Sequence, residues 1–200
     1  MKIHNEEDIL RLVQSDPWMM SVLETASLLH LPDWWACAGF VRSKIWDTLH
    51  GFAERTPLPD VDVVYFDPSN LDEAEEKRLE EQLRSMDPTI PWSVKNEARM
   101  HLINNMTPFS SSTDAISNFT ETATALGLSL DDEGQVILTA PHGIDDAVNM
   151  VLRPTPHFAA DKERHPIFVK RIAQKNWQQT WSQLRLHTSS TVGDSSTLDW

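Results

Sequence analysis

An apolar strand pattern followed at once by a long amphipathic helix pattern constrains the fold of this chain most strongly. Val61 to Phe66 form the clearest strand pattern, which Asp67-Pro68 ends. Residues 71–86 place apolar side chains at helical spacing and acidic and basic side chains four residues apart, which predicts a helix. Strand and helix patterns also alternate along the rest of the chain. We therefore predict an α/β or α+β fold with a central mixed sheet flanked by helices.

The other elements are predicted from the same kinds of pattern. Asn5 and Asp16-Pro17 are typical helix starts for two N-terminal helices. Residues 92–105 fit a strand and a helix equally well. The remaining predictions are strands at 34–41, 136–138 and 151–153 and helices at 42–50, 113–126, 145–149 and 167–186.

Length and composition limit the kind of protein. A chain of 200 residues suits one domain, which we place at residues 1–187, and the Ser/Thr-rich residues 188–200 are expected to be a mobile tail. Acidic residues exceed basic ones, 30 to 17, for a net charge of −13. Such a chain is not expected to bind nucleic acids generally, because neutralising phosphates requires an excess of Lys and Arg.

The cysteine count and the lack of long apolar runs indicate the cellular compartment. Cys37 is the single cysteine, so a disulfide framework and a Cys-cluster zinc site are excluded within the chain. No apolar run is long enough to span a membrane, and the first residues lack the pattern of a signal peptide. We expect a cytoplasmic protein without a membrane partner.

Two neighbouring segments carry the residues best suited to chemistry. Asp60 and Asp62 lie two residues apart at the start of the predicted strand, so period 2 places them on one face. Two carboxylates so placed suit Mg²⁺, which binds carboxylates together with substrate phosphates. The other segment is the turn at Gly39, where the first helical turn would offer N–H groups to an anion and Arg42 and Lys44 would add positive charge. Together they describe metal-assisted phosphoryl or nucleotidyl transfer.

The chain also resembles a bacterial family of nucleotidyltransferases assigned to the polymerase-beta superfamily. The resemblance covers roughly residues 32–184, in family order. It is carried by the segments WWACAGFVRSKIWDTLHG, DVDVVYFD, WSVKNEARMH, TETATALG, APHGIDD, VLRPTP and KNWQQTW.

The resemblance implies a polymerase-beta-like core with added N- and C-terminal helices, an NTP substrate and Mg²⁺ or Mn²⁺ held by Asp60 and Asp62. The phosphates would be bound at Gly39, Arg42, Ser43 and Lys44. It also assigns Arg99 and His101, within the WSVKNEARMH segment, to nucleotide binding. The superfamily turn is typically Gly-Gly or Gly-Ser, whereas Phe40 follows Gly39 here, and Ser43 could supply the missing hydroxyl.

A third carboxylate is usual in this superfamily and has three candidates, namely Glu97, Asp145 and Asp146. We name Glu97 as the catalytic candidate because Glu97 and His101 lie on the same side of the chain in a strand and in a helix alike. The alternative for Glu97 is a surface salt-bridge ladder with Arg99.

Two functions follow from these observations. The first is a metal-dependent enzyme that moves a nucleoside monophosphate from an NTP to an unidentified acceptor. The alternative is a catalytically inactive module on the same fold that binds nucleotides or proteins.

Overall fold

The computed structural model describes residues 2–104 and 106–187, so the predicted tail at 188–200 lies outside the described residues. The helices are α1 (Glu6–Gln14), α2 (Pro17–Ser27), α3 (Gly39–His50), α4 (Glu73–Met86), α5 (Glu97–Asn104), α6 (Ser112–Ser117), α7 (Asp145–Val148), α8 (Pro156–Ala159) and α9 (His165–Lys175), with short 3-10 helices η1 (Thr122–Thr124) and η2 (Trp177–Gln179). The strands are β1 (Trp35–Cys37), β2 (Val61–Tyr65), β3 (Trp92–Asn96), β4 (Gly127–Leu130), β5 (Val136–Thr139), β6 (Val151–Leu152) and β7 (Arg185–Leu186).

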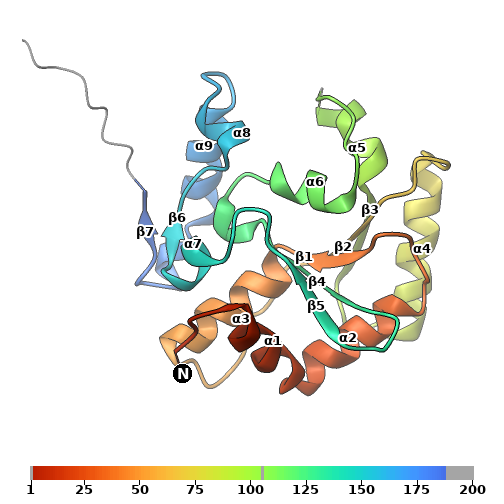
Figure 1. The fold of residues 1–200 in the computed structure, drawn as a ribbon, viewed down its shortest axis with the longest axis horizontal. Coiled ribbons are helices and arrows are strands. Elements are labelled where there is room, and N and C mark those ends of the chain that lie inside the picture. The colour runs from red at the N-terminus through yellow and green to blue at the C-terminus, as the bar shows by residue number, and fades with distance from the viewer. Residues whose placement is uncertain (1, 105, 188–200) are drawn as a thin grey trace, which may run out of the picture.

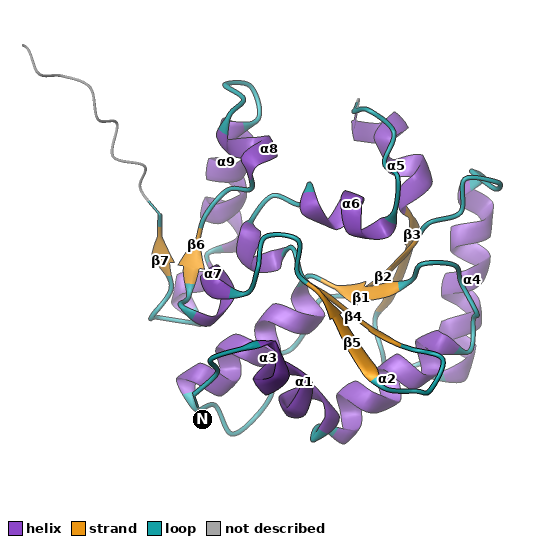
Figure 2. Ribbon diagram, viewed as in Figure 1, coloured by secondary structure: helices purple, strands orange, loops and turns teal. Residues whose placement is uncertain are grey.

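Five strands form the central sheet in the order β3-β2-β1-β4-β5 (Figure 2). β2 and β3 run parallel, and the other neighbouring pairs run antiparallel. The prediction of a mixed sheet flanked by helices is therefore confirmed. The parallel pair places the ends of β2 and β3 at the same edge of the sheet, and α4 is the crossover between them.

The two faces of the sheet are covered differently. Ala36, Val63 and Val94 belong to the main core, together with apolar side chains of α1 to α4. On the opposite face, Cys37 and Val64 form a smaller cluster with Ile116 of α6. Because side chains alternate along a strand, Asp62 lies on the face of Cys37 and Val64 and not in the main core.

Both predicted N-terminal helix starts are confirmed. The Asn5 side chain accepts the Asp8 N–H at 2.9 Å, and the Asp16 carboxylate accepts the N–H groups of Trp18 and Met19. Asp16 also binds Lys44 at 2.7 Å and Arg55 at 2.8 Å. The cap of α2 thereby fixes α2 against α3.

The helix predicted at 113–126 is wrong, because α6 ends at Ser117 and the chain then forms η1 and β4. Gly127, which directly follows the predicted helix, lies in β4 and pairs with Cys37 of β1. A Cβ at Gly127 would lie 3.0 Å from Thr139 Cγ2 and 3.1 Å from Trp35 Cβ. Glycine is therefore required at this position by close packing and not by helix termination.

Residues 92–105 divide between both alternatives, with β3 ending at Asn96 and α5 beginning at Glu97. The Asn96 side chain explains the change. It accepts the Ala98 N–H at 3.1 Å and donates to the carbonyls of Asp67 and Asn70 at 2.8 Å. Within the described residues, no helix has the length and apolar character needed to cross a membrane.

The helix predicted at 167–186 is too long, because α9 ends at Lys175 and Asn176 adopts a left-handed conformation with φ +45°. The chain then passes through η2 and returns beside β6 as β7 (Figure 1). Trp177 and Trp181 of this return both pack edge-on against Trp46 of α3, at 5.7 and 5.0 Å between ring centroids. Tertiary packing, and not one continuous helix, places these tryptophans together.

Candidate active site

The turn between β1 and α3 forms one end of the candidate site. β1 ends at Cys37, Ala38 adopts φ +53° and ψ −110°, and α3 begins at Gly39. The residue in the unusual conformation is thus Ala38, and the helix begins at Gly39, three residues earlier than predicted, because the predicted strand 34–41 already ends at Cys37. The Gly39 and Phe40 N–H groups donate to no group among the described residues and are available to an anion.

Replacing Ala38 with glycine is expected to raise the free energy of unfolding by about 1 kcal/mol. Residues with a side chain are strained at positive φ, and glycine is not. Chemical denaturation measures the change. Ala36→Gly is the matched control: Ala36 lies buried in the same strand, so this change should destabilise the protein. A loss of stability in Ala38→Gly would contradict the strain.

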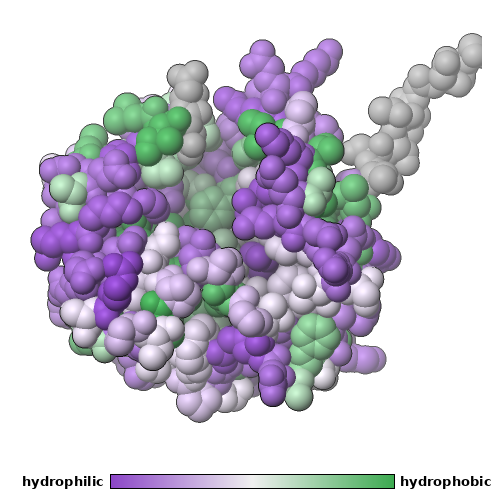
Figure 3. Space-filling model, turned by 180° about the vertical axis from the view of Figure 1, so that it is seen from behind, coloured by the Kyte–Doolittle hydropathy of each residue, from purple (hydrophilic) through white to green (hydrophobic). Residues whose placement is uncertain are grey.

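A cavity of about 450 Å³ adjoins this turn. Seen from behind, the surface is hollowed between two projections (Figure 3). The cavity is lined by residues of this turn, of β2, of the segments before and after α6 and of the C-terminal helices. They are Ala38, Asp62, Met106, Asn118, Phe119, Thr120, Thr124, His157, Phe158, Arg164, Ile167 and Arg171.

Asp62 is the acidic group of this cavity. Burial raises the pKa of the Asp62 carboxyl, and the charge of Asp60 raises it further, while Arg42 and Arg171 lower it. Asp60 directly precedes β2 and is exposed to solvent. The predicted pair is thus close enough to interact electrostatically, although burial raises the pKa of Asp62 more than the charge of Asp60 does.

Arg42, in the first turn of α3, is a buried cation without an acidic partner. Its side chain forms no ion pair with a described residue, and its Nε has no hydrogen-bond partner among them. Burial lowers the pKa of Arg42 to about 10, so the guanidinium stays charged at neutral pH. The charges of Glu121, Asp60 and Asp62 act in the opposite direction, which places Arg42 near the acidic group of the cavity.

Sequence reasoning missed the cations that α9 contributes. Arg171 lines the cavity and is held there by Glu121, a fully buried carboxylate that accepts its Nε at 2.8 Å. Arg164 immediately precedes α9 and also lines the cavity. The sequence did contain a signal for these cations. Residues seven apart lie on one face of a helix, and Arg164 and Arg171 have that spacing.

None of the six residues assigned to nucleotide binding lines the cavity, although Gly39 directly follows the lining residue Ala38. The Ser43 side chain is buried with an unpartnered hydroxyl, and Lys44 binds Asp16. Arg99 donates twice to Glu76 of α4, at 3.0 and 2.9 Å, and His101 Nδ1 lies 2.9 Å from the Ala98 carbonyl. The roles proposed for these six in nucleotide binding stay predictions.

Glu97 begins α5, one helical turn before His101, and only 7% of it is exposed. Burial, with the charges of Asp62 and Glu76, raises the pKa of Glu97 to about 7. The predicted alternative, a ladder with Arg99, is not formed, because Arg99 binds Glu76. The described residues include no group of three His, Cys, Asp or Glu side chains close enough to hold a metal ion, and the role of Glu97 as a third carboxylate stays a prediction.

Glu97 makes stability depend on pH. Its pKa is raised from the ordinary 4.5 to about 7, so its favourable contribution is complete below pH 4.5 and is lost as the pH rises through 7. We expect Glu97→Gln to exceed the parent in unfolding free energy by about 3 kcal/mol above pH 7.5, and by almost nothing at pH 4. Denaturation of the metal-free protein across this range measures it, with the exposed Glu24→Gln as control. A difference independent of pH would contradict the prediction.

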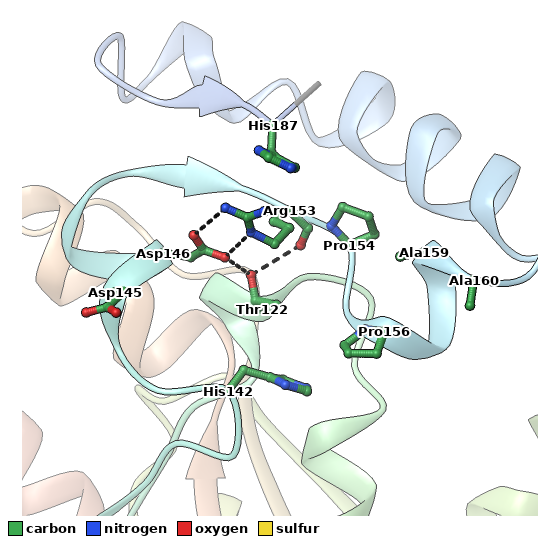
Figure 4. A pocket seen from close by; sticks show the side chains of 10 residues that line it. All are labelled: Thr122, His142, Asp145, Asp146, Arg153, Pro154, Pro156, Ala159, Ala160 and His187. Atoms are coloured by element: carbon green, nitrogen blue, oxygen red, sulfur yellow. Dashed lines mark hydrogen bonds and ion pairs between the residues drawn. The ribbon is translucent and has the colours of Figure 1, made fainter. Parts of the chain in front are cut away.

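A second, larger cavity of about 760 Å³ contains the other two candidates for the third carboxylate (Figure 4). Asp146 accepts hydrogen bonds from Thr122 Oγ1 at 2.7 Å and Arg153 Nε at 2.8 Å. Asp145 is exposed beside it. Asp62 does not line this cavity, so the structure does not bring Asp145 or Asp146 into the site with Asp62.

Comparison with known proteins agrees with this architecture. Residues 24–186 match a protein family described as "Nucleotidyltransferase". One solved structure, described as revealing "a CCA-adding enzyme head domain", is 35% identical with a TM-score of 0.82, and the match covers 94% of this chain and 98% of the other. No curated protein sequence matches the chain.

Two larger enzymes share the fold at lower identity. The Thermotoga maritima CCA-adding enzyme, solved with tRNA, is 15% identical with a TM-score of 0.56, over 95% of this chain and 44% of that one. A CCA-adding enzyme solved with CTP is 15% identical with a TM-score of 0.57, over 94% and 44%. This chain therefore spans less than half the length of these two enzymes.

Proposed function

Because the chain belongs to the nucleotidyltransferase family, with a polymerase-beta-type fold, we propose that the cavity at Asp62 binds an NTP and transfers its nucleoside monophosphate to an acceptor hydroxyl with the aid of a divalent metal. One observation carries this proposal. Asp62 and Arg171 line one cavity beside the N-terminus of α3, and the charges of Asp60 and Arg42, which lie outside its lining, act on Asp62.

The donor atoms of the acidic end fit Mg²⁺ or Mn²⁺. Asp60 and Asp62 offer hard oxygen ligands, and two protein carboxylates leave positions for substrate phosphates, as is usual for Mg²⁺. A bound ion would activate the acceptor hydroxyl and neutralise charge on the departing pyrophosphate. Burial first, and then the charge of Asp60, raise the pKa of Asp62, and a bound cation would favour the charged form of both carboxylates.

The basic end suits the triphosphate. Arg42 is charged, buried and without an acidic partner, so a phosphate oxygen could replace the solvation that burial removes. The free N–H groups of Gly39 and Phe40 add donors at the positive end of the α3 dipole. These groups would orient the triphosphate and stabilise the negative charge of pyrophosphate as it leaves.

The acceptor hydroxyl is the next part of the proposed reaction to assign. The similar structure at 35% identity is described as a CCA-adding enzyme head domain, and a larger enzyme of the same fold was solved with tRNA. An RNA 3′ hydroxyl is therefore an acceptor to test beside small alcohols, sugars and proteins. The net charge of −13 favours a local contact with such an RNA over a broad phosphate-binding surface.

Thermal denaturation with each of the four NTPs, with and without Mg²⁺ or Mn²⁺, tests the proposal. At least one NTP with metal should stabilise the protein, by about 2.7 kcal/mol at a hundred times its Kd. Asp145→Asn, in the larger cavity, should keep this stabilisation. No shift with any NTP and no pyrophosphate release with any acceptor class would overturn the proposal. A shift that Asp145→Asn abolishes would move the NTP to the larger cavity.

A further inference from the structure

Arg42 and Arg171, the two arginines nearest the acidic end of the cavity, share one aromatic wall. The Arg42 guanidinium carbon lies 4.2 Å from the ring centroid of Trp177, and that of Arg171 lies 5.7 Å from the same ring. Trp46 adds a second, longer contact to Arg42 at 5.4 Å. Trp177 is 7% exposed and belongs to η2, so the C-terminal segment supplies this wall.

The contact with Trp177 compensates for the electrostatic repulsion between Arg42 and Arg171. Arg171 is close enough to Arg42 for its charge to lower the pKa of Arg42. Glu121 binds Arg171 through Nε and its charge also acts on Arg42, but Arg42 forms no ion pair or hydrogen bond with an acid among the described residues. The negative face of an indole stabilises a guanidinium stacked on it and leaves the N–H groups at its edge free to bind a ligand.

We propose that Trp177 is a positioning residue that holds Arg42 and Arg171 in place to bind the triphosphate of the substrate. This inference rests on the function proposed above. Trp177 does not line the cavity and follows α9 in the chain. Through these two arginines it sets the affinity of the cavity for phosphate. Arg42 cannot be held by an acid, as Arg171 is, without losing the unpaired charge that the phosphate needs.

Trp181 offers a matched control. Trp181 packs against Trp46 in nearly the same way as Trp177, with interplanar angles of 67° and 66°. Both indoles are buried, at 4% and 7% exposure. Trp181 has no arginine on its ring within the described part of the chain, and its Nε1 donates to Asp47 at 2.8 Å. Loss of either ring costs packing, but only loss of Trp177 removes an aromatic face from the arginines.

The test is titration calorimetry of inorganic triphosphate, which contains no base or sugar, at a temperature where each variant is folded. We expect Trp177→Leu to weaken binding about tenfold and Trp177→Phe two- to threefold, because phenylalanine keeps a weaker aromatic face. Trp181→Leu and Trp181→Phe should stay within twofold of the parent. If Trp177→Leu does not fold, the two phenylalanine variants still make the comparison.

Each outcome decides between the two proposals. Equal weakening by the Trp177 and Trp181 variants, or no weakening by either, would overturn the positioning role while leaving NTP binding in place. Failure of the parent protein to bind both inorganic triphosphate and any NTP would overturn the proposed function as well. A graded loss confined to position 177 supports the inference.

Discussion

Replacing Asp62 with asparagine is expected to lower the rate of pyrophosphate release by about 10³-fold while leaving the metal-free protein at least as stable as the parent. The first effect follows because charge stabilisation by a bound metal contributes several kcal/mol to the transition state. The second follows because burial and Asp60 already disfavour the charged form of Asp62, so its loss removes a repulsion.

Two measurements on one variant separate a metal ligand from a structural acid. A structural role would make Asp62→Asn lose about 1–3 kcal/mol of stability through broken hydrogen bonds, with metal-dependent NTP binding unaffected. A ligand role predicts the reverse, namely loss of the metal-dependent thermal shift with little change in the metal-free melting curve. Asp145→Asn should behave like the parent in both measurements.

Local sequence patterns say more about the acidic end of the site than about the basic end. Asp60 and Asp62 adjoin a strand whose apolar pattern is unambiguous, so local periodicity predicts that they share a face of that strand. Arg171 lies in α9, and Trp177 in the chain's return past α9, which depends on long-range packing against Trp46. No local pattern encodes that contact.

The errors in the predicted secondary structure have a similar cause. Residues 113–126 have helical spacing, yet the chain leaves the helix at Ser117, and Thr124 then satisfies buried polar groups of Glu121. Gly127 is explained by Trp35 and Thr139, which are distant in sequence. Helix starts, in contrast, were correct at Asn5 and Asp16, because a cap is a contact between near neighbours.

Lys44 and Arg99 show that the resemblance of a segment to a family does not fix the role of each residue in that segment. Both belong to segments that resemble the family, and both are cations near predicted site residues. In the structure, each binds a buried carboxylate of a helix, Asp16 for Lys44 and Glu76 for Arg99. A cation already paired at hydrogen-bond distance has less to offer a phosphate than Arg42, which has no such partner in residues 2–104 and 106–187.

Glu76 is the buried group whose loss should destabilise the fold most. Its carboxylate is fully buried and accepts hydrogen bonds from Arg99, from Lys95 at 3.3 Å and from the Asn96 N–H at 3.1 Å. Burial alone would raise the pKa of Glu76, but these partners, Arg99 first, outweigh it and lower the pKa. The stabilisation is therefore complete above pH 4.5 and is lost as the pH falls through the lowered pKa.

We expect Glu76→Ala to lose about 3–5 kcal/mol at pH 7, roughly 10 °C or more in Tm, because Arg99 and the Asn96 N–H would be left buried without their partner. Glu80→Ala is the matched control one turn further along α4. Glu80 accepts the Val94 N–H only at 3.4 Å and pairs with the half-exposed Arg84, so we expect a loss below about 1 kcal/mol. Arg99→Ala should lower Tm nearly as much as Glu76→Ala while keeping the affinity for inorganic triphosphate. A stable Arg99→Ala protein with weakened triphosphate binding would instead return Arg99 to the nucleotide site.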